Sequence, residues 1–261
     1  MAKLLFLGTG GSMGVPVIGC KCEVCSHGGH YNQRKRTAAY VEIDDQHFLI
    51  DVGPDFRSQA LMYGIDHIDA VLLTHTHFDH IAGIDELRIF NFLQKKPLPT
   101  LLSASSFEDL QKRYFYLFQT GDEKASATAK LDCRVLEKDF GEVSFEGVDI
   151  AFTSYWQMGM QVNGYRFGEL AYLTDVQRYD EKIFEFLKGV KTLVLSALRY
   201  RDSPFHLTIA QAIAFAQKVG AERTFFTHLD HEVEHDTVNA KLPQGIELAY
   251  DGLEIEFNYG R

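Results

Sequence analysis

The chain has 261 residues, of which 46% are hydrophobic and 24% are charged, proportions that exclude a disordered or fibrous chain. Its 26 basic and 36 acidic residues give a formal net charge of −10, which argues against nucleic acid as a substrate or partner. We expect a single domain over residues 1–261, because packed-sheet folds often run to about 200–250 residues as one unit.

The chain begins MAKLLFLGTGG, in which residues 3–8 have the apolar character of a β-strand. Glycines follow this run where a signal peptide would carry its cleavage region. The sequence also lacks an apolar run of the roughly 18 residues that a membrane span needs. We therefore expect a cytoplasmic protein that does not enter a membrane.

Short strand-like runs recur along the chain, and helix-like stretches separate them. The predicted helices cover residues 105–116, 180–188 and 208–219, the last with apolar residues at helical spacing. This pattern predicts an α/β fold in which two sheets pack face to face with helices outside. The predicted strands are 3–8, 38–43, 47–51, 70–74, 148–154, 164–168, 170–175, 192–196, 223–227 and 253–257.

The cysteines are unevenly distributed. Cys20, Cys22 and Cys25 lie within six positions, whereas Cys133 is alone. In a cytosolic chain, such a cluster indicates a metal site before it indicates a disulfide.

The run LLTHTHFDHIAGIDEL places three histidines and an aspartate within six positions, directly after a predicted buried strand. In an extended backbone His75 and His77 project to one side, and the following turn brings Asp79 and His80 to the same place. Imidazole nitrogens and a carboxylate suit zinc, manganese or iron, and this mixture is typical of a two-metal hydrolytic site. The motif therefore predicts a metal centre at the end of a strand.

The string HTHFDH resembles the signature motif of the metallo-β-lactamase superfamily. That resemblance implies a four-layer αββα sandwich with two metals at one edge of the sheets. It also implies that the LIDVG run, with Asp51 and Gly53, supports the metal loop, and that Asp175 in AYLTD bridges the metals. The implied active-site ligands are His75, His77, Asp79, His80, Asp175 and His228.

A narrower resemblance begins with LGTGGSMGVPVIGCKCEVC and continues through NGYRF, SALRYR, FHLT and THLDHEVEH. These elements are similar to the branch that contains phosphoribosyl 1,2-cyclic phosphate phosphodiesterase of the carbon-phosphorus lyase pathway. The resemblance implies a structural zinc whose fourth ligand is a distant histidine, whereas His27 or His30 offers a local alternative. Three thiolates and one imidazole form a closed shell with no position open for chemistry. The implied structural site is Cys20, Cys22, Cys25 and His231.

His206 follows SPF and precedes a predicted helix. In the resembled branch the corresponding histidine passes a proton to the leaving group, so His206 and Asp79 are the candidate catalytic residues. A surface histidine is the alternative for His206. Arg199 and Arg201 could hold a phosphate as bidentate donors, although a solvated run of charge explains them equally well.

One position departs from the family pattern. In relatives, a histidine ligand lies seven residues before the glycine of the G-Y-R element, and counting back from Gly164 that place is Gln157. No histidine lies between His80 and His206 to replace it. A neutral amide oxygen is a poorer zinc ligand than imidazole, though it is acceptable to manganese. We expect one active-site metal to bind weakly; the alternative is a shifted loop in which Gln157 faces solvent.

The resemblance implies hydrolysis of a small cyclic phosphodiester by metal-bound hydroxide, with zinc or manganese lowering the pKa of water to about 7. His206 would protonate the departing alkoxide. One alternative is another hydrolase of the same fold, such as a tRNA 3′-processing nuclease, a thioester hydrolase or a lactamase. A second is a weakly catalytic metal-binding protein of cofactor biosynthesis. The expected partner is a small phosphodiester rather than nucleic acid or a membrane. Assembly into a homodimer is an open alternative.

Overall fold

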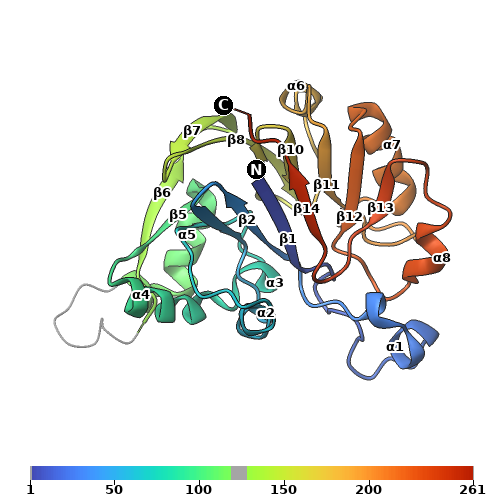
Figure 1. Ribbon diagram of the computed structural model, residues 1–261, viewed down its shortest axis with the longest axis horizontal. Coiled ribbons are helices and arrows are strands. Elements are labelled where there is room, and N and C mark those ends of the chain that lie inside the picture. The colour runs from blue at the N-terminus through green and yellow to red at the C-terminus, as the bar shows by residue number, and fades with distance from the viewer. Residues whose placement is uncertain (1, 119–127, 261) are drawn as a thin grey trace.

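The computed structural model describes residues 2–118 and 128–260 and contains two mixed β-sheets with helices outside them (Figure 1). The predicted four-layer αββα sandwich is thereby confirmed. The first sheet has the order β14 (Glu254–Phe257), β1 (Ala2–Gly8), β2 (Ala38–Ile43), β3 (Gln46–Ile50), β4 (Ala70–Leu72), β5 (Leu98–Ser103), β6 (Leu131–Leu136). The second has the order β13 (Ile246–Leu248), β12 (Arg223–Thr227), β11 (Thr192–Ser196), β10 (Leu170–Leu173), β9 (Met160–Phe167), β8 (Val148–Gln157), β7 (Phe140–Phe145).

Helices cover the outer faces of both sheets, with α2, α4 and α5 beside the first sheet and α6, α7 and α8 beside the second (Figure 1). None of the helices in the described part of the chain is both long and apolar enough to cross a membrane. The α-helices are α1 (Glu23–His27), α2 (Phe56–Tyr63), α3 (Phe78–Ile81), α4 (Arg88–Gln94), α5 (Ala104–Arg113), α6 (Ile183–Phe186), α7 (Ile209–Val219) and α8 (His235–Asn239). Single 3₁₀ turns cover His30–Asn32, Ile84–Leu87 and Phe115–Phe118.

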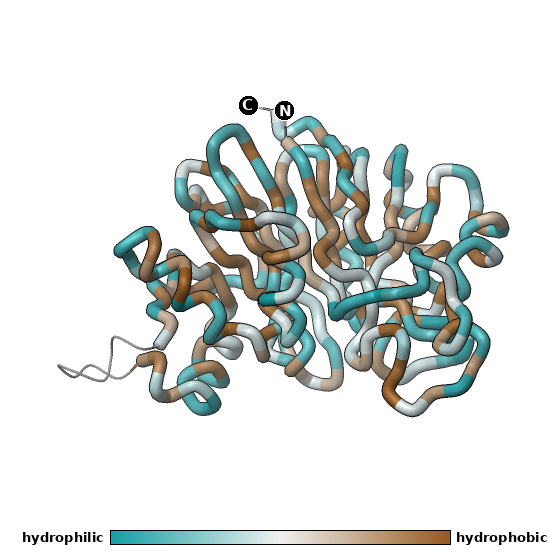
Figure 2. The backbone as a smooth tube through the Cα atoms, turned by 60° about the horizontal axis from the view of Figure 1, so that its bottom comes forward, coloured by the Kyte–Doolittle hydropathy of each residue, from teal (hydrophilic) through white to brown (hydrophobic). Residues whose placement is uncertain are grey.

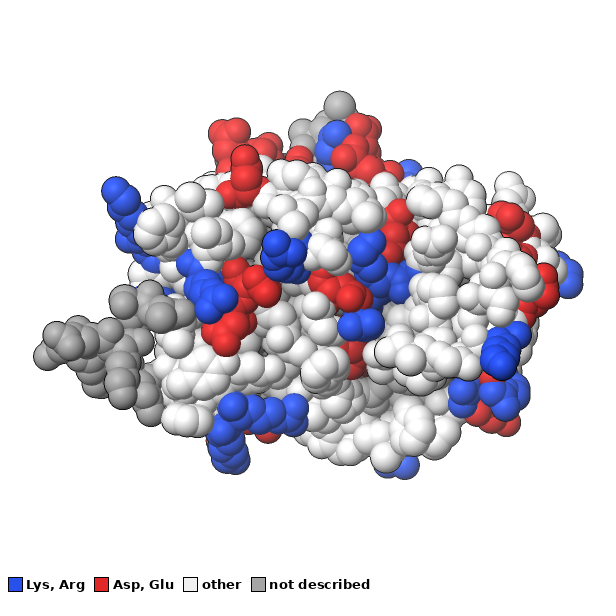
Figure 3. Space-filling model, turned by 90° about the horizontal axis from the view of Figure 1, so that it is seen from below, with Lys and Arg blue, Asp and Glu red and all other residues white. Residues whose placement is uncertain are grey.

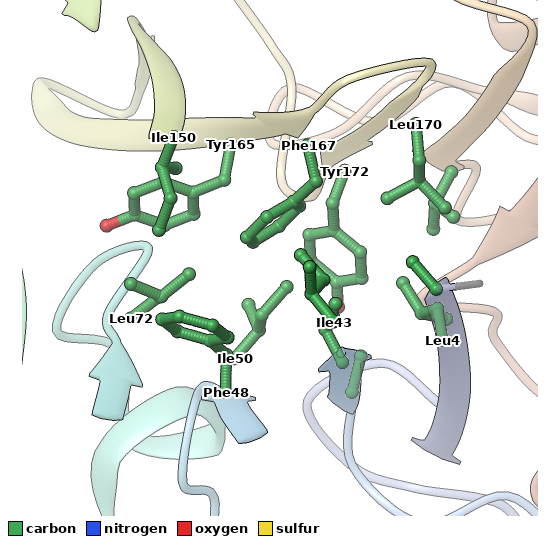
Figure 4. Packing of buried hydrophobic residues seen from close by; sticks show 14 of the residues in the cluster. Leu4, Ile43, Phe48, Ile50, Leu72, Ile150, Tyr165, Phe167, Leu170 and Tyr172 are labelled. Carbon is green, nitrogen blue, oxygen red and sulfur yellow. The ribbon is translucent and has the colours of Figure 1, made fainter. Parts of the chain in front are cut away.

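Apolar side chains from both sheets form the central core. Phe48 of the first sheet packs on Phe167 of the second, with ring centroids 6.1 Å apart (Figure 4). Burying each such side chain contributes about 1.5–3 kcal/mol. Figure 2 shows hydrophobic strands inside and hydrophilic segments on the periphery. The buried Tyr165 hydroxyl donates to the Leu73 carbonyl oxygen at 2.7 Å, which ties the second sheet to the segment before HTHFDH.

Strand direction brings the predicted site residues to one edge. Strands β3 and β4 are parallel, as are β10, β11 and β12. Asp51 follows β3 and His75 follows β4 in the first sheet. Asp175 follows β10 and His228 follows β12 in the second. Because the carboxyl ends of parallel strands meet at the same edge of a sheet, these four residues gather near α3, at the bottom of Figure 1.

The structure corrects several predicted elements. The helix predicted at 208–219 is confirmed as α7, but the one at 105–116 ends at Arg113, and only Ile183–Phe186 of 180–188 is α-helical. Strands β5, β6, β7 and β13 were not predicted. Pro97 and Pro99 hide β5, because proline is usually confined to sheet edges. Strands β6 and β7 have an exposed face and carry too few apolar residues to stand out.

Gly53→Ala is expected to lower the free energy of unfolding by about 1–3 kcal/mol, the usual cost of overpacking. A Cβ at Gly53 would lie 2.1 Å from the Asp79 carbonyl oxygen, so the backbone of the HTHFDH segment would have to move. Urea unfolding checks this, with Gly29→Ala as the control because a Cβ at Gly29 meets nothing within 4 Å. Equal stability of the two variants would contradict the expected clash.

Candidate active site

The HTHFDH motif lies in the turn from β4 into α3, where the backbone changes from extended to helical. His75 is fully buried, and its Nε2 lies 2.9 Å from Nδ1 of His77. Thr74 fixes the other side of the ring, because its Oγ1 lies 3.0 Å from Nδ1 of His75. Burial lowers the pKa of His75 well below its usual value, so this imidazole is neutral and keeps a lone pair for a ligand.

His80 lies at the centre of the cluster. Its Nδ1 is hydrogen-bonded to Oδ2 of Asp51 at 2.6 Å, which directs Nε2 to the opposite side. There Nε2 lies 3.1 Å from Asp175 Oδ2 and 3.5 Å from Asp79 Oδ2, yet it has no hydrogen-bond partner. A buried nitrogen and two carboxylates therefore surround a common point without bonding one another.

His228 faces the same carboxylates from the second sheet. Its Nε2 lies 3.3 Å from Asp79 Oδ2 and 3.4 Å from Asp175 Oδ1. Burial opposes protonation of both His80 and His228, but the surrounding carboxylates outweigh it and raise the pKa of each. The cluster therefore requires positive charge, which divalent cations can supply.

The donor set suits two divalent metals, because it combines neutral imidazoles with carboxylates. Within this buried cluster, three groups of side chains each place one ligand atom per residue within 4.8 Å of one another. These groups are His75, His80 and Asp175; Asp79, His80 and His228; and Asp175, His206 and His228. These groups contain five of the six predicted active-site ligands, and His77 joins them only through its 2.9 Å contact with His75. The unpartnered Nε2 of His80 is the observation that favours a metal over a hydrogen-bonded network.

Three residues of this region have left-handed backbone, with φ of +62° at Asp51, +56° at Asp175 and +59° at His228. This conformation is uncommon outside glycine and costs about 1–3 kcal/mol at each position. The left-handed conformation turns the chain sharply at the end of each strand and directs the side chain of that residue into the cluster. Positive φ at three residues of one site therefore indicates function rather than a folding requirement.

Gln157 is 2% exposed and points into the cluster from the end of β8. Its Nε2 donates to Asp175 Oδ1 at 3.0 Å, whereas its buried Oε1 has no partner. The alternative of a shifted loop with Gln157 in solvent is therefore wrong. A half-turn of the amide would exchange the two atoms and place Oε1 beside Asp175, at the cluster.

His206 lies against the cluster rather than on the surface. Its ring is 4.7 Å from that of His228, and its Nδ1 is 3.1 Å from Asp175 Oδ1. Burial lowers the pKa of His206 to about 4 despite the attraction of Asp175. An anionic substrate beside the ring would raise this pKa, because negative charge favours the protonated form.

A pocket of about 210 Å³ opens beside His206. Arg199 lines it, and the buried Nε of Arg199 has no hydrogen-bond partner. Arg201 instead pairs with Glu232, and its side chain is 73% exposed. The two arginines that we considered together are therefore separated, and only Arg199 lies at the pocket. The remaining lining residues are Gly11, Ser12, Met13, Gly14, Val17, Leu198, Phe205, Leu229 and Asp230.

The cysteine cluster lies in the loop around α1, beside the segment that follows His228 (Figure 1). Nδ1 of His231 lies 3.3 Å from Cys20 Sγ, 3.3 Å from Cys22 Sγ and 3.6 Å from Cys25 Sγ. Tetrahedral zinc places sulfur and nitrogen ligands about 3.6 Å apart, so this geometry fits. The local alternatives, His27 and His30, are not part of the group.

Asp230 is a site residue that the sequence reasoning missed. Its Oδ1 lies 3.2 Å from Nε2 of His231, and its Oδ2 lies 3.5 Å from Nη1 of Arg199. A carboxylate on the far nitrogen of a metal-binding histidine orients the ring and strengthens it as a ligand. The only signal in the sequence was its place between two histidines in THLDHEVEH.

Comparison with known proteins places this geometry in a family. Residues 46–229 match the family described as "Beta-lactamase superfamily domain". A crystal structure of a diphosphatase from the PhnP family is 36% identical, with a TM-score of 0.90 over 98% of this chain and 97% of that one. The octanoyltransferase of Porphyromonas gingivalis is 35% identical over 97% of this chain, which spans only 51% of that relative. A probable metallo-hydrolase, YhfI, of Bacillus subtilis is 26% identical over 87% of this chain and 91% of its own. The family match extends over more than half of the sequence, and the chain therefore belongs to the β-lactamase superfamily of metal-dependent hydrolases.

Proposed function

We propose that this hydrolase cleaves a P–O bond in a small phosphodiester, of the class of phosphoribosyl 1,2-cyclic phosphate. The observation that carries the proposal is the pocket in which Arg199 and His206 lie beside the buried carboxylate–imidazole cluster. A volume of about 210 Å³ suits a small phosphate ester better than a polymer. Arg199 offers donors whose fork geometry matches phosphate oxygens.

The chain's own residues have separable roles in this proposal. Asp79, His80 and His228 would hold one metal, and His75 and His77 the other, with Asp175 between them. When bound, such metals supply hydroxide at neutral pH and neutralise charge on phosphoryl oxygens. Arg199 positions the phosphate. His206 donates a proton to the departing alkoxide oxygen, so that the product is a phosphomonoester.

A diphosphate is the second candidate substrate. The PhnP-family protein that is 36% identical is described as a diphosphatase, and its likeness covers nearly the whole of both chains. Diphosphates and diesters both carry negatively charged non-bridging oxygens on phosphorus, so the cluster and Arg199 suit both. They differ in the leaving group, because a phosphate leaves more readily than an alkoxide and needs His206 less.

Octanoyl transfer does not form part of the proposal. The relative with that name is about twice as long as this chain. Burial raises the pKa of the Cys133 thiol to about 12, which leaves it a poor nucleophile, and the other three cysteines face His231. Cys22, whose pKa is lowered to about 6, is assigned below to a zinc site, and a thiolate bound to zinc in a closed shell is not free to form an acyl-enzyme.

Surface charge supports a small substrate over a polyanion. Figure 3 shows the face that contains the site, where Lys and Arg are interspersed with Asp and Glu among broad uncharged areas. Together with the net charge of −10, this mixture gives little attraction for a phosphate backbone.

We also infer a structural zinc at Cys20, Cys22, Cys25 and His231. A hydrogen bond from the Cys25 backbone amide is the largest cause that lowers the pKa of Cys22 to about 6, and a hydrogen bond with His231 is the second. Burial raises the pKa of Cys25 to about 11. Holding all three cysteines as thiolates therefore requires a cation. Zinc is the cation that this ligand set favours.

His206→Ala is expected to slow alkyl and cyclic phosphodiesters by about 10²–10⁴-fold, because their leaving groups need a proton. Bis(p-nitrophenyl) phosphate, whose leaving group is stable as an anion, should be spared. Steady-state kinetics on both classes checks this, with exposed Arg201→Ala as the control. Equal losses on the two classes would assign His206 to binding instead. Turnover of diphosphate, thioester or RNA without any phosphodiester activity would overturn the proposed substrate.

Gln157→His is expected to tighten the weaker active-site metal at least about tenfold, since imidazole is a better ligand for zinc or manganese than an amide oxygen. After dialysis, the unaltered protein should retain one active-site metal and regain activity when metal is added. The variant should retain two. Elemental analysis and metal titration measure this, with Gln217→His on the exposed side of α7 as the control. Two equally tight active-site ions in the unaltered protein would refute the weak site.

Cys22→Ser should reduce zinc content by about one ion per chain and lower the melting temperature, because the N-terminal loop loses its link to the segment after β12. Elemental analysis and thermal unfolding record both effects. The matched control is Cys133→Ser, which removes a thiol outside the cluster. Zinc content that stays unchanged in Cys22→Ser would exclude the site.

A further inference from the structure

A further group of imidazole and carboxylate side chains, separate from the buried cluster and from the cysteine cluster, lies at the opposite edge of the first sheet. His47 is the second residue of β3, and Asp69 immediately precedes β4. Asp51 lies four positions after His47, which corresponds to roughly 13 Å along an extended strand. The group, which also contains His67, is therefore distinct from the candidate active site and shares no residue with it.

One ligand atom from each of the three side chains lies within 4.8 Å of the others. Asp69 is central: its Oδ2 lies 3.3 Å from Nδ1 of His47, and its Oδ1 lies 2.9 Å from Nε2 of His67. The two imidazole rings meet edge to face, with centroids 5.6 Å apart. Two imidazole nitrogens and a carboxylate thus converge from different directions.

The backbone holds these groups in place without a metal. The His47 amide donates to Asp69 Oδ2 at 2.9 Å, and the Asp69 amide donates to the His47 carbonyl oxygen at 2.9 Å. Tyr40 on β2 stacks on the His47 ring, and its hydroxyl donates to the His67 carbonyl oxygen at 2.8 Å. The geometry is therefore preorganised by the sheet rather than by a flexible loop.

The group of His47, His67 and Asp69 is also accessible to solvent and lies near acidic residues. The side chains of His47 and His67 are 30% and 44% exposed, so an ion can enter and keep water ligands. Glu42 lies opposite His47 in the β2–β3 register, and Asp66 precedes His67. Burial opposes ionisation of Asp69, but hydrogen bonds from His67 and the His47 backbone outweigh it and lower its pKa.

We propose that His47, His67 and Asp69 form a surface site for a first-row transition-metal ion such as Zn²⁺, Co²⁺ or Ni²⁺. Two imidazoles and one carboxylate suit these ions and leave positions for water, whereas Mg²⁺ and Ca²⁺ prefer all-oxygen shells. The ion replaces the two histidine–aspartate hydrogen bonds and joins the start of β3 to the start of β4.

The test uses the full chain, loaded with zinc and then dialysed, and titrates it with Co²⁺. Cobalt binds most sites more weakly than zinc and therefore leaves the zinc already present in place. The expected result is uptake of two cobalt ions per chain: one enters the weak active-site position that dialysis empties, and the other causes paramagnetic shifts of the His47 and His67 ring signals in NMR spectra. The melting temperature should also rise as cobalt is added, because the ion binds the folded chain.

His67→Gln should weaken binding of the second cobalt ion by more than about tenfold, which is the smallest loss expected for an outer-shell partner. The thermal shift should become smaller, because only the active-site ion still binds. His27→Gln is the matched control. His27 is also an exposed histidine and lies 3.6 Å from the Glu23 carboxylate, but no third metal-ligating side chain joins this pair. His47→Gln provides an independent variant if His67→Gln is poorly folded. No shift of the His47 and His67 ring signals at millimolar cobalt, shifts confined to the active-site histidines, or equal uptake by His67→Gln and His27→Gln would each overturn the proposal.

Discussion

Buried negative charge at one edge of the sandwich is the constraint on which the site depends. Asp51, Asp79 and Asp175 all lie within 3.5 Å of the His80 ring nitrogens, in a region almost closed to solvent. Carboxylates are not stable in such surroundings without positive partners. Divalent ions would supply the positive charge. This explains why the backbone is strained at the strand ends, why Gly53 lies against the HTHFDH segment and why the histidines point inward.

Local patterns in the sequence predicted the parts of the site that lie within one turn of chain. HTHFDH placed four ligands together because alternating extended residues and a following helical turn have known directions. The other members come from β10 and β12, and only resemblance to a family linked them, since periodicity carries no information on which strand ends meet. The roles of Asp230, and of His47 with His67 and Asp69, depend on contacts across the sheets that one strand does not encode. The same limitation hid β6 and β7, which have one exposed face.

The two inferred metal regions near α1 and α3 are physically connected. Asp230 contacts His231 of the cysteine cluster on one side and Arg199 of the substrate pocket on the other. Gly11 in the N-terminal loop lies so close to His228 that an added Cβ would be 3.3 Å from its ring. The cysteine cluster therefore contacts the wall of the pocket in two places, through Asp230 and through Val17, whose amide donates to Cys25 Sγ.

The pairing of the first strand with the last has a consequence for the order in which the protein forms. Strand β1 is flanked by β2 and β14, and the loop after it bonds to Leu229 and approaches His231. Contacts that span so much of the chain form slowly, because a long segment must first be closed into a loop. On the ribosome, β1 is made early, but one of its edges has no partner until β14 has been synthesised. An unpaired edge of this kind is open to association with other chains. This edge of β1 therefore stays open to association until β14 follows, although every residue of the pocket and of the cysteine cluster is made before β14.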